Sequence, residues 1–326
     1  MIPRPEYPRP QMERREWMNL NGTWQFEMDH GRSGKERKLW QSERFSQTIL
    51  VPFCPESKLS GLAHTDFMEC VWYMRTVEIP DAWVAAGRRT LLNIGACDFE
   101  TEVYVNGQYI GRHIGGYVSF MMDITAALRA GENRIVISAT DLLRSQGQPG
   151  GKQCRKYASI GCSYTRTTGI WQTVWLENVP DHYIKHTKYR PSLENQSVFI
   201  EVVCEHADGK TLRAEAFFGG KRVGEAQTVV TGKVAALEIK LSELHLWNVG
   251  DGQLYDLELD LEGDRIYSYF GMRKVEWKNG KTYINGKIVY QRLILDQGYY
   301  PDGIYTAPNE AELIADIQRS LDMGFN

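Results

Sequence analysis

Short runs of alternating apolar and polar residues fill the first half of the chain. They are rich in β-branched and aromatic residues and are separated by Gly, Pro, Asn and Asp; examples are WYMRTVEIP, RTLLNIGA and NRIVISATD. Asn106-Gly107 is the strongest turn signal, because a type I′ hairpin needs a positive φ at both central positions. Helical patterns are limited to two short segments, 81–87 and 123–131. Residues 1–180 are therefore predicted to form a jelly-roll β-sandwich.

A second all-β unit is predicted over residues 181–272. In LYDLELDLEG, four apolar side chains alternate with acidic ones, and SVFIEVVCEH and AALEIKLS repeat the alternation. A period of two marks strands that are buried on one face. The length of the unit and its regular turn signals predict an immunoglobulin-like sandwich. The Cys…Trp…Cys framework of antibody domains is missing, so this prediction rests on the pattern alone.

The pattern changes at about residue 273. KTYINGKIVYQRLILDQG predicts a hairpin at Asn285-Gly286 and then an almost continuously apolar strand. A helix follows, with Asn309 as its N-cap and Gly324 as its stop. Its apolar stripe consists of Leu313, Ile314, Ile317 and Leu321. Strand, loop and helix make one βα unit, whereas a (β/α)₈ barrel needs about 250 residues. Residues 273–326 are therefore predicted to be the first βα unit of a truncated TIM barrel.

Composition restricts the class of protein. The 326 residues suit two or three domains, and 42% hydrophobic with 24% charged residues fits soluble globular domains. The net charge is -3 and no long basic run occurs, so neither nucleic acid nor an anionic membrane is an expected partner. No apolar run approaches the length of a membrane span, and the start of the chain lacks a signal-peptide pattern. We expect a cytoplasmic protein, unless a signal sequence was trimmed.

Cysteine and histidine spacing predicts neither disulfides nor a metal site. The cysteines are irregularly spaced, which predicts free, buried thiols in a reducing compartment. They are Cys54, Cys70, Cys97, Cys154, Cys162 and Cys204. A disulfide between Cys154 and Cys162 is the alternative in an oxidising compartment. His182 and His186 fall on one face of a predicted strand, but no third metal ligand accompanies them.

Seven strings, in order along the chain, carry a resemblance to a known family. They are LNGTWQF, VPFCPES, VWYMRTVEIP, VYVNGQYIGRHIGGYVSFMMDIT, GENRIVISATD, TTGIWQTVWLENVP and YFGMRKVEWKNGKTYINGKIVYQR. Together they resemble glycoside hydrolase family 2, the family of β-galactosidases, β-glucuronidases and β-mannosidases. The resemblance implies a jelly-roll "sugar-binding" domain, an immunoglobulin-like domain and the start of a TIM barrel. Many of the matched residues form turns or cores, so they indicate the scaffold more firmly than an active site.

The resemblance also implies where the chemistry lies. Retaining glycosidases use a general acid/base and a nucleophile, two carboxylates about 5–5.5 Å apart. In the family both lie on later barrel strands, so no catalytic residue is expected in residues 1–326. The family's Asn-Glu dipeptide has a counterpart in Asn309-Glu310, but this pair opens a helix, where Asn caps and Glu complements the dipole. No cofactor is required by this chemistry, although some members bind a metal ion.

Substrate-binding candidates lie at the end of the predicted barrel strand. The family usually reads Arg-Gly-x-Asn-x-His here, and this chain reads RLILDQ. Arg292 matches the motif, while Leu293, Leu295 and Gln297 replace its Gly, Asn and His. Asp296 and Gln297 are candidates by location, because barrel active sites form at the C-terminal ends of strands. The alternative is that both only stabilise the loop.

The loop 149–169 supplies a further candidate, Arg166. It aligns with a basic residue of the β-galactosidase branch, whereas the branch's acidic residue has no counterpart near Ser163. Arg166 either braces the loop or contacts a sugar. Four tyrosines could stack on a sugar ring, although surface tyrosines more often pack against protein: Tyr157, Tyr164, Tyr299 and Tyr300.

The sequence thus predicts the N-terminal, non-catalytic region of a retaining family 2 β-glycosidase. The parent would hydrolyse terminal β-linked sugars, with a carbohydrate as its partner, and this chain alone is expected to be inactive. One alternative is a stand-alone carbohydrate-binding module, which a patch of coplanar aromatic side chains would favour. Another is an oligomerisation module, in which the apolar stripe of the last helix pairs two copies into a homo-oligomer.

Overall fold

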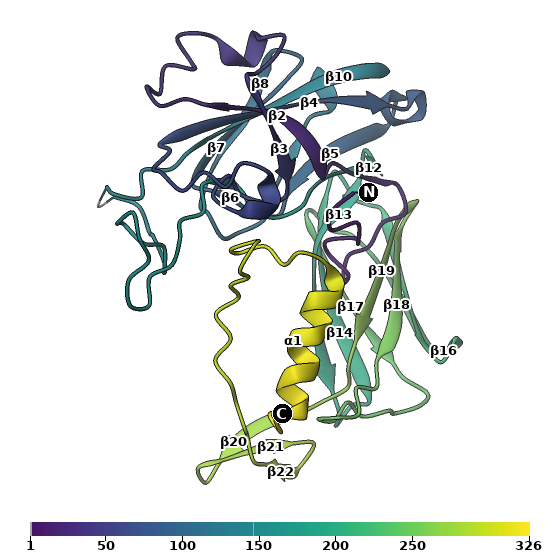
Figure 1. The fold of residues 1–326 in the computed structure, drawn as a ribbon. Helices are drawn as coiled ribbons and strands as arrows, with labels where there is room; N and C mark the ends of the chain where they lie inside the picture. Colours follow the sequence, from purple (N-terminus) through teal and green to yellow (C-terminus); the bar gives the residue numbers. More distant parts are fainter. Residues whose placement is uncertain (1, 146) are drawn as a thin grey trace. The chain divides into compact units, whose positions relative to one another are not determined.

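The chain is mainly β, with strands β1 to β22 and a single α-helix, α1, in the part that the structure describes (Figure 1). The structure is a computed structural model and describes residues 2–145 and 147–326. Its contacts divide the chain into two compact units. The first comprises Met1–Pro8, Trp17–Asn178 and Asp296–Ala315, and the second comprises Arg9–Glu16, Val179–Leu295 and Asp316–Asn326.

A jelly-roll sandwich forms the first unit. Its six-stranded sheet has the order β3-β2-β4-β10-β7-β8, its four-stranded sheet has the order β1-β12-β5-β9, and β11 pairs with β6. The strands are β1 (Trp17–Asn19), β2 (Gly22–Met28), β3 (Gln47–Val51), β4 (Cys70–Ile79), β5 (Arg88–Ile94), β6 (Cys97–Asp98), β7 (Glu100–Val105), β8 (Gln108–Ile114), β9 (Phe120–Asp123), β10 (Gly131–Thr140), β11 (Gly169–Ile170) and β12 (Val174–Pro180). The predicted short helical segments appear as 3-10 turns, Asp81–Val84 and Thr125–Ala127.

Both faces of the first half of strand β4, residues 70–74, are buried, which explains the continuous apolar sequence of that half. Tyr73 packs in the core between the two sheets, together with Trp24, Phe26 and Leu176. Trp72, its neighbour in the chain, points to the opposite face and joins a second apolar cluster with Leu39, Phe45 and Tyr104. Alternate side chains of a strand point to opposite faces of the sheet. A strand that is buried on both faces therefore has apolar residues at consecutive positions.

The Asn106-Gly107 hairpin is confirmed. Both residues have positive φ angles, 51° and 80°, as a type I′ turn needs. The Asn106 side chain fixes the turn, because its Nδ2 donates to the carbonyl of Ala127 at 2.8 Å and its Oδ1 accepts from the amide of Arg134 at 2.9 Å. Asn106 therefore both forms the turn and joins it to two distant segments of the chain.

The second unit is an immunoglobulin-like sandwich of a three-stranded sheet, β13-β14-β17, and a four-stranded sheet, β16-β15-β18-β19. The predicted alternation is confirmed in β18, where Tyr255, Leu257, Leu259 and Leu261 are buried. A small third sheet holds the predicted hairpin at Asn285-Gly286. The strands are β13 (Tyr183–Ser192), β14 (Ser197–Glu205), β15 (Thr211–Phe218), β16 (Lys221–Val229), β17 (Val234–Lys240), β18 (Tyr255–Leu261), β19 (Asp264–Phe270), β20 (Val275–Lys278), β21 (Lys281–Ile284) and β22 (Lys287–Val289).

A buried ion pair fixes the segment Arg9–Glu16 to this sandwich. Nε and Nη2 of Arg14 donate to the two carboxylate oxygens of Asp264 at 2.8 and 2.9 Å, and Nη2 also donates to the carbonyl of Ile184. Arg14 and Asp264 are only 4% and 2% exposed. A guanidinium and a carboxylate held in this two-point geometry satisfy each other's hydrogen bonds inside a protein.

Helix α1 (Glu310–Asp322) has the predicted ends. Oδ1 of Asn309 accepts from the amide of Glu312 at 3.0 Å, which is the N-cap bond. At the other end Gly324 has a φ of 87°, and its amide donates to the carbonyl of Leu321 at 2.8 Å. With the bond from Phe325 N to the carbonyl of Ser320, this is a Schellman stop. No residue of the helix is buried.

The predicted barrel strand before the helix does not form. Residues 290–299 have no regular structure, and Leu293 and Leu295 are 70% and 77% exposed. A strand of a parallel barrel is hydrogen-bonded to a strand on each side, and among the described residues no strand pairs with this stretch. The domain boundaries at 180 and 272 stay a prediction, and the division by contacts places Asp296–Ala315 in the first unit.

Candidate functional site

A loop that follows the irregular stretch packs onto the first unit. Thr306 is fully buried, and its hydroxyl donates to the carbonyl of Trp171 at 2.5 Å. The amide of Leu59 donates to the carbonyl of Asp302 at 3.1 Å. A β-carbon on Gly303 would collide with the carbonyl oxygen of Thr306, so only glycine fits this turn. The loop is therefore held in one conformation against the jelly roll.

Five aromatic rings, here called the tyrosine cluster, meet where this loop packs: Tyr117, Tyr164, Trp171, Tyr299 and Tyr305. Neighbouring ring centroids lie 4.1 Å apart for Tyr164 and Tyr299, 4.7 Å for Tyr299 and Tyr305, and 5.1 Å for Trp171 and Tyr305. Tyr117 is 44% exposed. The cluster offers apolar ring faces beside phenolic hydroxyls, a combination that suits a ligand with both apolar and polar faces.

Gln153 holds the cluster from below. Its Nε2 donates to the hydroxyl of Tyr117 at 2.9 Å and to Oδ2 of Asp98 at 2.5 Å, and its Oε1 accepts from the amide of Thr167. The hydroxyls of Tyr117 and Tyr305 lie 3.3 Å apart. A buried network that begins at Asp98 therefore helps to position Tyr117.

Three buried carboxyls, here called the buried acid group, lie beneath this network: Glu56, Asp98 and Asp141. Burial raises the pKa of Asp98 to about 8, and the charges of Asp141 and Glu56 add to the increase. Burial likewise raises the pKa of Glu56 to about 7 and that of Asp141 to about 6. Each charge removed from water is destabilised and repels the others, so the group retains protons near neutral pH.

The structure places the predicted substrate residues of the 292–297 stretch in different settings. Oε1 of Gln297 accepts from Nζ of Lys152 at 2.7 Å, which joins the loop to the 149–169 loop. Oδ1 of Asp296 accepts from the amide of Gly298 within its own turn at 2.8 Å. Arg292 belongs to the second unit, where its amide donates to the side chain of Asn326.

The side chain of Arg166 is buried in this structure. It is 2% exposed, and its Nη1 and Nη2 donate to the carbonyls of Lys156 and Thr65. Its guanidinium carbon lies 4.0 Å from the centroid of the Phe67 ring. Tyr157, another predicted stacking residue, is 68% exposed and packs edge-on against the same ring.

Sequence reasoning missed Tyr117, Trp171 and Tyr305. Trp171 lies in the string TTGIWQTVWLENVP and Tyr117 in VYVNGQYIGRHIGGYVSFMMDIT. As aromatic residues of family-like motifs, both could have been proposed as site residues. No pattern joins them to Tyr305, because residues 117 and 305 are separated by 188 positions. Only the packing of the loop brings the three together.

The structure adds three observations on the chemistry of the chain. All six cysteines are free, so the alternative disulfide between Cys154 and Cys162 is not formed, and Cys162 is exposed against the expectation that every thiol is buried. Within residues 2–145 and 147–326, no three His, Cys, Asp or Glu side chains are grouped so that they could hold a metal ion. Over the same residues, no helix has the length and apolar character needed to cross a membrane.

Comparison with family profiles decides the family. The profile "Glycosyl hydrolases family 2, sugar binding domain" matches residues 17–180, and the profile "Glycosyl hydrolases family 2" matches residues 182–273. The chain belongs to glycoside hydrolase family 2. The two matched ranges correspond to the jelly-roll and immunoglobulin-like sandwiches of the structure.

Curated relatives in family 2 are glycosidases. A β-glucuronidase of Paenibacillus borealis is 26% identical over 301 residues, which are 85% of this chain and 48% of that protein. A β-glucuronidase of Felis catus is 24% identical over 87% of this chain and 48% of its own length. A β-galactosidase of Thermoanaerobacter pseudethanolicus is 25% identical over 68% of this chain and 31% of its length. The chain thus spans about half the length, or less, of the curated relatives it matches.

Solved structures confirm the fold. A β-glucuronidase of Lactobacillus rhamnosus aligns with a TM-score of 0.79 at 20% identity, covering 97% of this chain and 55% of that one. A β-glucuronidase of Ruminococcus gnavus aligns with a TM-score of 0.78 at 18% identity, covering 100% and 56%.

The family 2 string TTGIW has a physical role in the tyrosine cluster. Gly169 has a φ of 72°, and a β-carbon there would collide with the hydroxyl of Tyr73. Two residues later, Nε1 of Trp171 donates to the carbonyl of Gly116 at 2.8 Å. The glycine lets the chain pass close to the core, and the tryptophan then fixes the loop that carries Tyr117.

Proposed function

We propose that this family 2 chain is the N-terminal, non-catalytic region of a retaining β-glycosidase that hydrolyses terminal β-linked sugars. The observation that carries the proposal is the pair of family 2 matches over residues 17–273, together with β-glucuronidase and β-galactosidase relatives about twice as long. In this scheme residues 1–180 and 181–272 are the two β domains, and 273–326 begin the barrel.

The chain by itself is expected to lack hydrolytic activity. A retaining mechanism needs two carboxyls that face the anomeric carbon from about 5–5.5 Å apart. Asn309 serves as a helix cap through its bond to the amide of Glu312, and Glu310 stands in the first helical turn. Glu56 and Asp98 are at most 3% exposed, so a glycosidic oxygen cannot reach them, and both carboxylate oxygens of Asp141 already accept hydrogen bonds, from Gln148 and Thr168. These settings support an inactive chain.

The proposed role of the jelly roll is to supply one wall of a sugar site. Two members of the tyrosine cluster, Tyr299 and Tyr305, lie on the loop that follows Asp296 and Gln297, the positions predicted at the end of the barrel strand. Gln297 accepts a hydrogen bond from Lys152, so an amide and an ammonium group stand beside the rings. We propose Asp296, Gln297, Arg292 and Arg166 as substrate-side residues, with Arg166 acting through the loop that it braces.

Enzyme assays test this proposal. The 326-residue chain and the longest polypeptide that its gene encodes are incubated with p-nitrophenyl β-glucuronide and β-galactoside. We expect hydrolysis only by a polypeptide that includes a complete barrel, with NMR showing that the first product keeps the β configuration. Specific hydrolysis by the 326-residue chain would contradict its assignment as non-catalytic.

A stand-alone carbohydrate-binding module is the second candidate, and the partly exposed Tyr117 in the tyrosine cluster favours it. Glycan-array binding by the 326-residue chain would support it, provided that Tyr117→Ala reduces the signal. Tyr109→Ala is the matched control, because Tyr109 is 55% exposed on strand β8 and outside the cluster. An array without signal would remove this candidate.

A further inference from the structure

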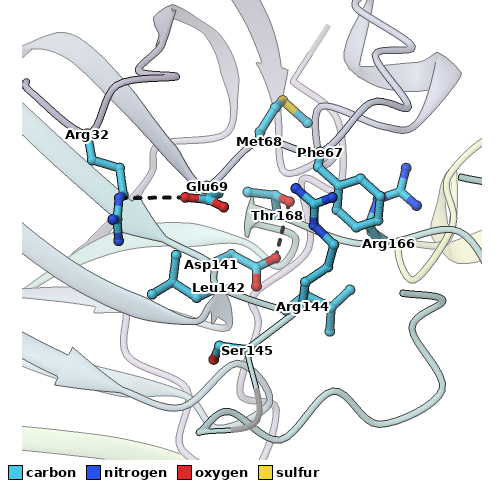
Figure 2. A pocket seen from close by; sticks show the side chains of 11 residues that line it. Arg32, Phe67, Met68, Glu69, Asp141, Leu142, Arg144, Ser145, Arg166 and Thr168 are labelled. Carbon is cyan, nitrogen blue, oxygen red and sulfur yellow. Dashed lines mark hydrogen bonds and ion pairs between the residues drawn. The ribbon is translucent and has the colours of Figure 1, made fainter. Parts of the chain in front are cut away.

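A cleft in the first unit lies apart from the residues of the tyrosine cluster. It has a volume of about 230 Å³ and is lined by the segments 67–69 and 141–145 with Arg32, Arg166 and Thr168 (Figure 2). A water molecule in the liquid occupies about 30 Å³, so the cleft has room for one small ligand but not for an oligosaccharide.

Two guanidinium groups dominate one side of the cleft. The guanidinium carbons of Arg144 and Arg166 lie 4.2 and 4.0 Å from the centroid of the Phe67 ring, and Figure 2 shows both side chains beside that ring. Cation–π contact uses the face of a guanidinium and not its N–H donors. In Arg166 the Nη1 and Nη2 groups donate to backbone carbonyls, which leaves Nε. The ring therefore presents two positive groups to the same space.

Hydrogen-bond donors remain available in this arrangement. Nε of Arg166 is buried and has no hydrogen-bond partner among the residues that the structure describes. Arg144 is exposed, and none of the ion pairs between described residues includes it. Buried donors in native proteins are nearly always satisfied, so an unpartnered Nε beside a cleft indicates a missing acceptor.

The acidic side chains of the lining are already engaged. Oδ1 of Asp141 accepts from Gln148 at 2.6 Å, and its Oδ2 accepts from the hydroxyl of Thr168 at 3.2 Å. Glu69 pairs with Arg32 at 3.6 Å (Figure 2). Three guanidinium groups and two carboxylates line the cleft, so its formal charge is +1. This balance suits one monoanionic group and disfavours a dianion such as phosphate.

We propose that this cleft binds a small organic acid, with its carboxylate held by Arg144 and Arg166. A planar carboxylate matches the fork of a guanidinium, and the hydroxyl of Ser145 and the apolar side chains of Met68 and Leu142 line the remaining space. The ligand has about the size of a monosaccharide, and a hexuronate is the probe of choice. The inference rests on the cleft alone and holds whether or not the parent is a glycosidase.

Titration of the 326-residue chain with sodium glucuronate, followed by ligand-observed NMR, tests the site. We expect a dissociation constant on the order of 1 mM, as is usual for a small polar ligand in an open cleft. Glucose, which lacks the carboxylate, and inorganic phosphate should each bind at least about tenfold more weakly. Undetectable glucuronate binding, or equal binding of glucose or phosphate, would overturn the proposal.

Variants locate the binding. Arg144→Gln should weaken glucuronate binding about tenfold, and Arg144→Lys should weaken it less, because lysine keeps the charge and loses the fork. Arg129→Gln is the matched control: Arg129 is exposed in the same unit, does not line the cleft, and should bind as the wild type does. Unchanged affinity in Arg144→Gln would place the ligand elsewhere. If Arg144→Gln lowers the melting temperature, the glucuronate affinity of Arg144→Lys decides instead, and an affinity equal to that of the wild type would place the ligand elsewhere.

Discussion

Three carboxyl groups of the first unit, those of Glu56, Asp98 and Asp141, are buried. The buried acid group has two oxygens, Oε1 of Glu56 and Oδ1 of Asp98, without a hydrogen-bond partner among the described residues. Amides and hydroxyls, such as those of Thr168 and Gln153, satisfy the other oxygens. Asp98, with a pKa of about 8, is therefore held mainly as a neutral acid at neutral pH, whereas Asp141, with a pKa of about 6, is mainly ionised there. The stability of the jelly roll should consequently depend on pH.

The jelly roll should lose stability as the pH rises from about 4 to about 8. An unfolded carboxyl has a pKa near 4, whereas the folded values are about 6 for Asp141, about 7 for Glu56 and about 8 for Asp98. The folded state then binds more protons than the unfolded chain, so the free energy of unfolding falls by up to about 1.4 kcal/mol per pH unit and group. Hydrogen exchange of the β4 amides at low and high pH measures the slope.

Asp98→Asn should flatten this pH dependence between about pH 6 and pH 8, because it removes the group with the highest pKa. Asp66→Asn, at an exposed carboxylate of the same unit, is the control and should leave the slope unchanged. A jelly roll that becomes more stable towards pH 8 would contradict the assigned direction of the pKa shifts.

Arg14 makes a residue-scale prediction for the second unit. Arg14→Met leaves Asp264 buried without its partner and should cost about 3–5 kcal/mol in the free energy of unfolding. Arg265→Met removes the exposed partner of Asp260 and should cost at most about 1 kcal/mol. Urea unfolding of both variants gives the comparison, and equal losses would show that the Arg14 pair contributes no more than a surface pair.

At the scale of elements, local signals and long-range packing divide what the sequence could predict. Both Asn-Gly hairpins and the two ends of helix α1 follow from the conformations that Asn and Gly adopt locally, and the structure confirms them. The strand predicted over residues 290–299 does not form, because a strand needs neighbouring strands to pair with, and the sequence of the stretch does not supply them. The tyrosine cluster could not be predicted for a related reason, because its members meet only through the packing of loops.

Helix α1 depends strongly on its cap. It has 13 residues and buries none of them, so propensity and end bonds carry most of its stability. Asn309→Ala removes the acceptor for the Glu312 amide and should destabilise the helix by about 1 kcal/mol, which lowers the helical circular dichroism signal. Asn309→Asp keeps a capping oxygen and should keep the signal. An unchanged signal in Asn309→Ala would mean that packing, and not the cap, stabilises the helix.

At the scale of the whole molecule, the exposed apolar side chains of the C-terminal region should drive self-association. Ile314, Ile317 and Leu321 are 59%, 64% and 54% exposed on one stripe of helix α1. Apolar surface of this kind is usually covered in a soluble protein. We expect the mass measured by light scattering to rise with protein concentration.

The double variant Ile314→Glu, Ile317→Glu should lower the concentration-dependent mass, whereas Gln318→Glu, on the same helix outside the stripe, should not. A chain that remains a monomer at every concentration would count against the stripe as an interface. A self-associating chain in which the double variant has no effect would move the interface to another surface.

The distribution of thiols over the molecule has a practical consequence. Cys54, Cys70, Cys97, Cys154 and Cys204 are buried, and Cys162 is exposed on the 149–169 loop. Maleimide reagents attack only thiolates that they can reach, so a fluorophore added to the native chain should attach at one position. The unmodified sequence therefore provides a single site for attaching a fluorescent label. This site, Cys162, lies on the loop that also carries Lys152, Tyr164 and Arg166.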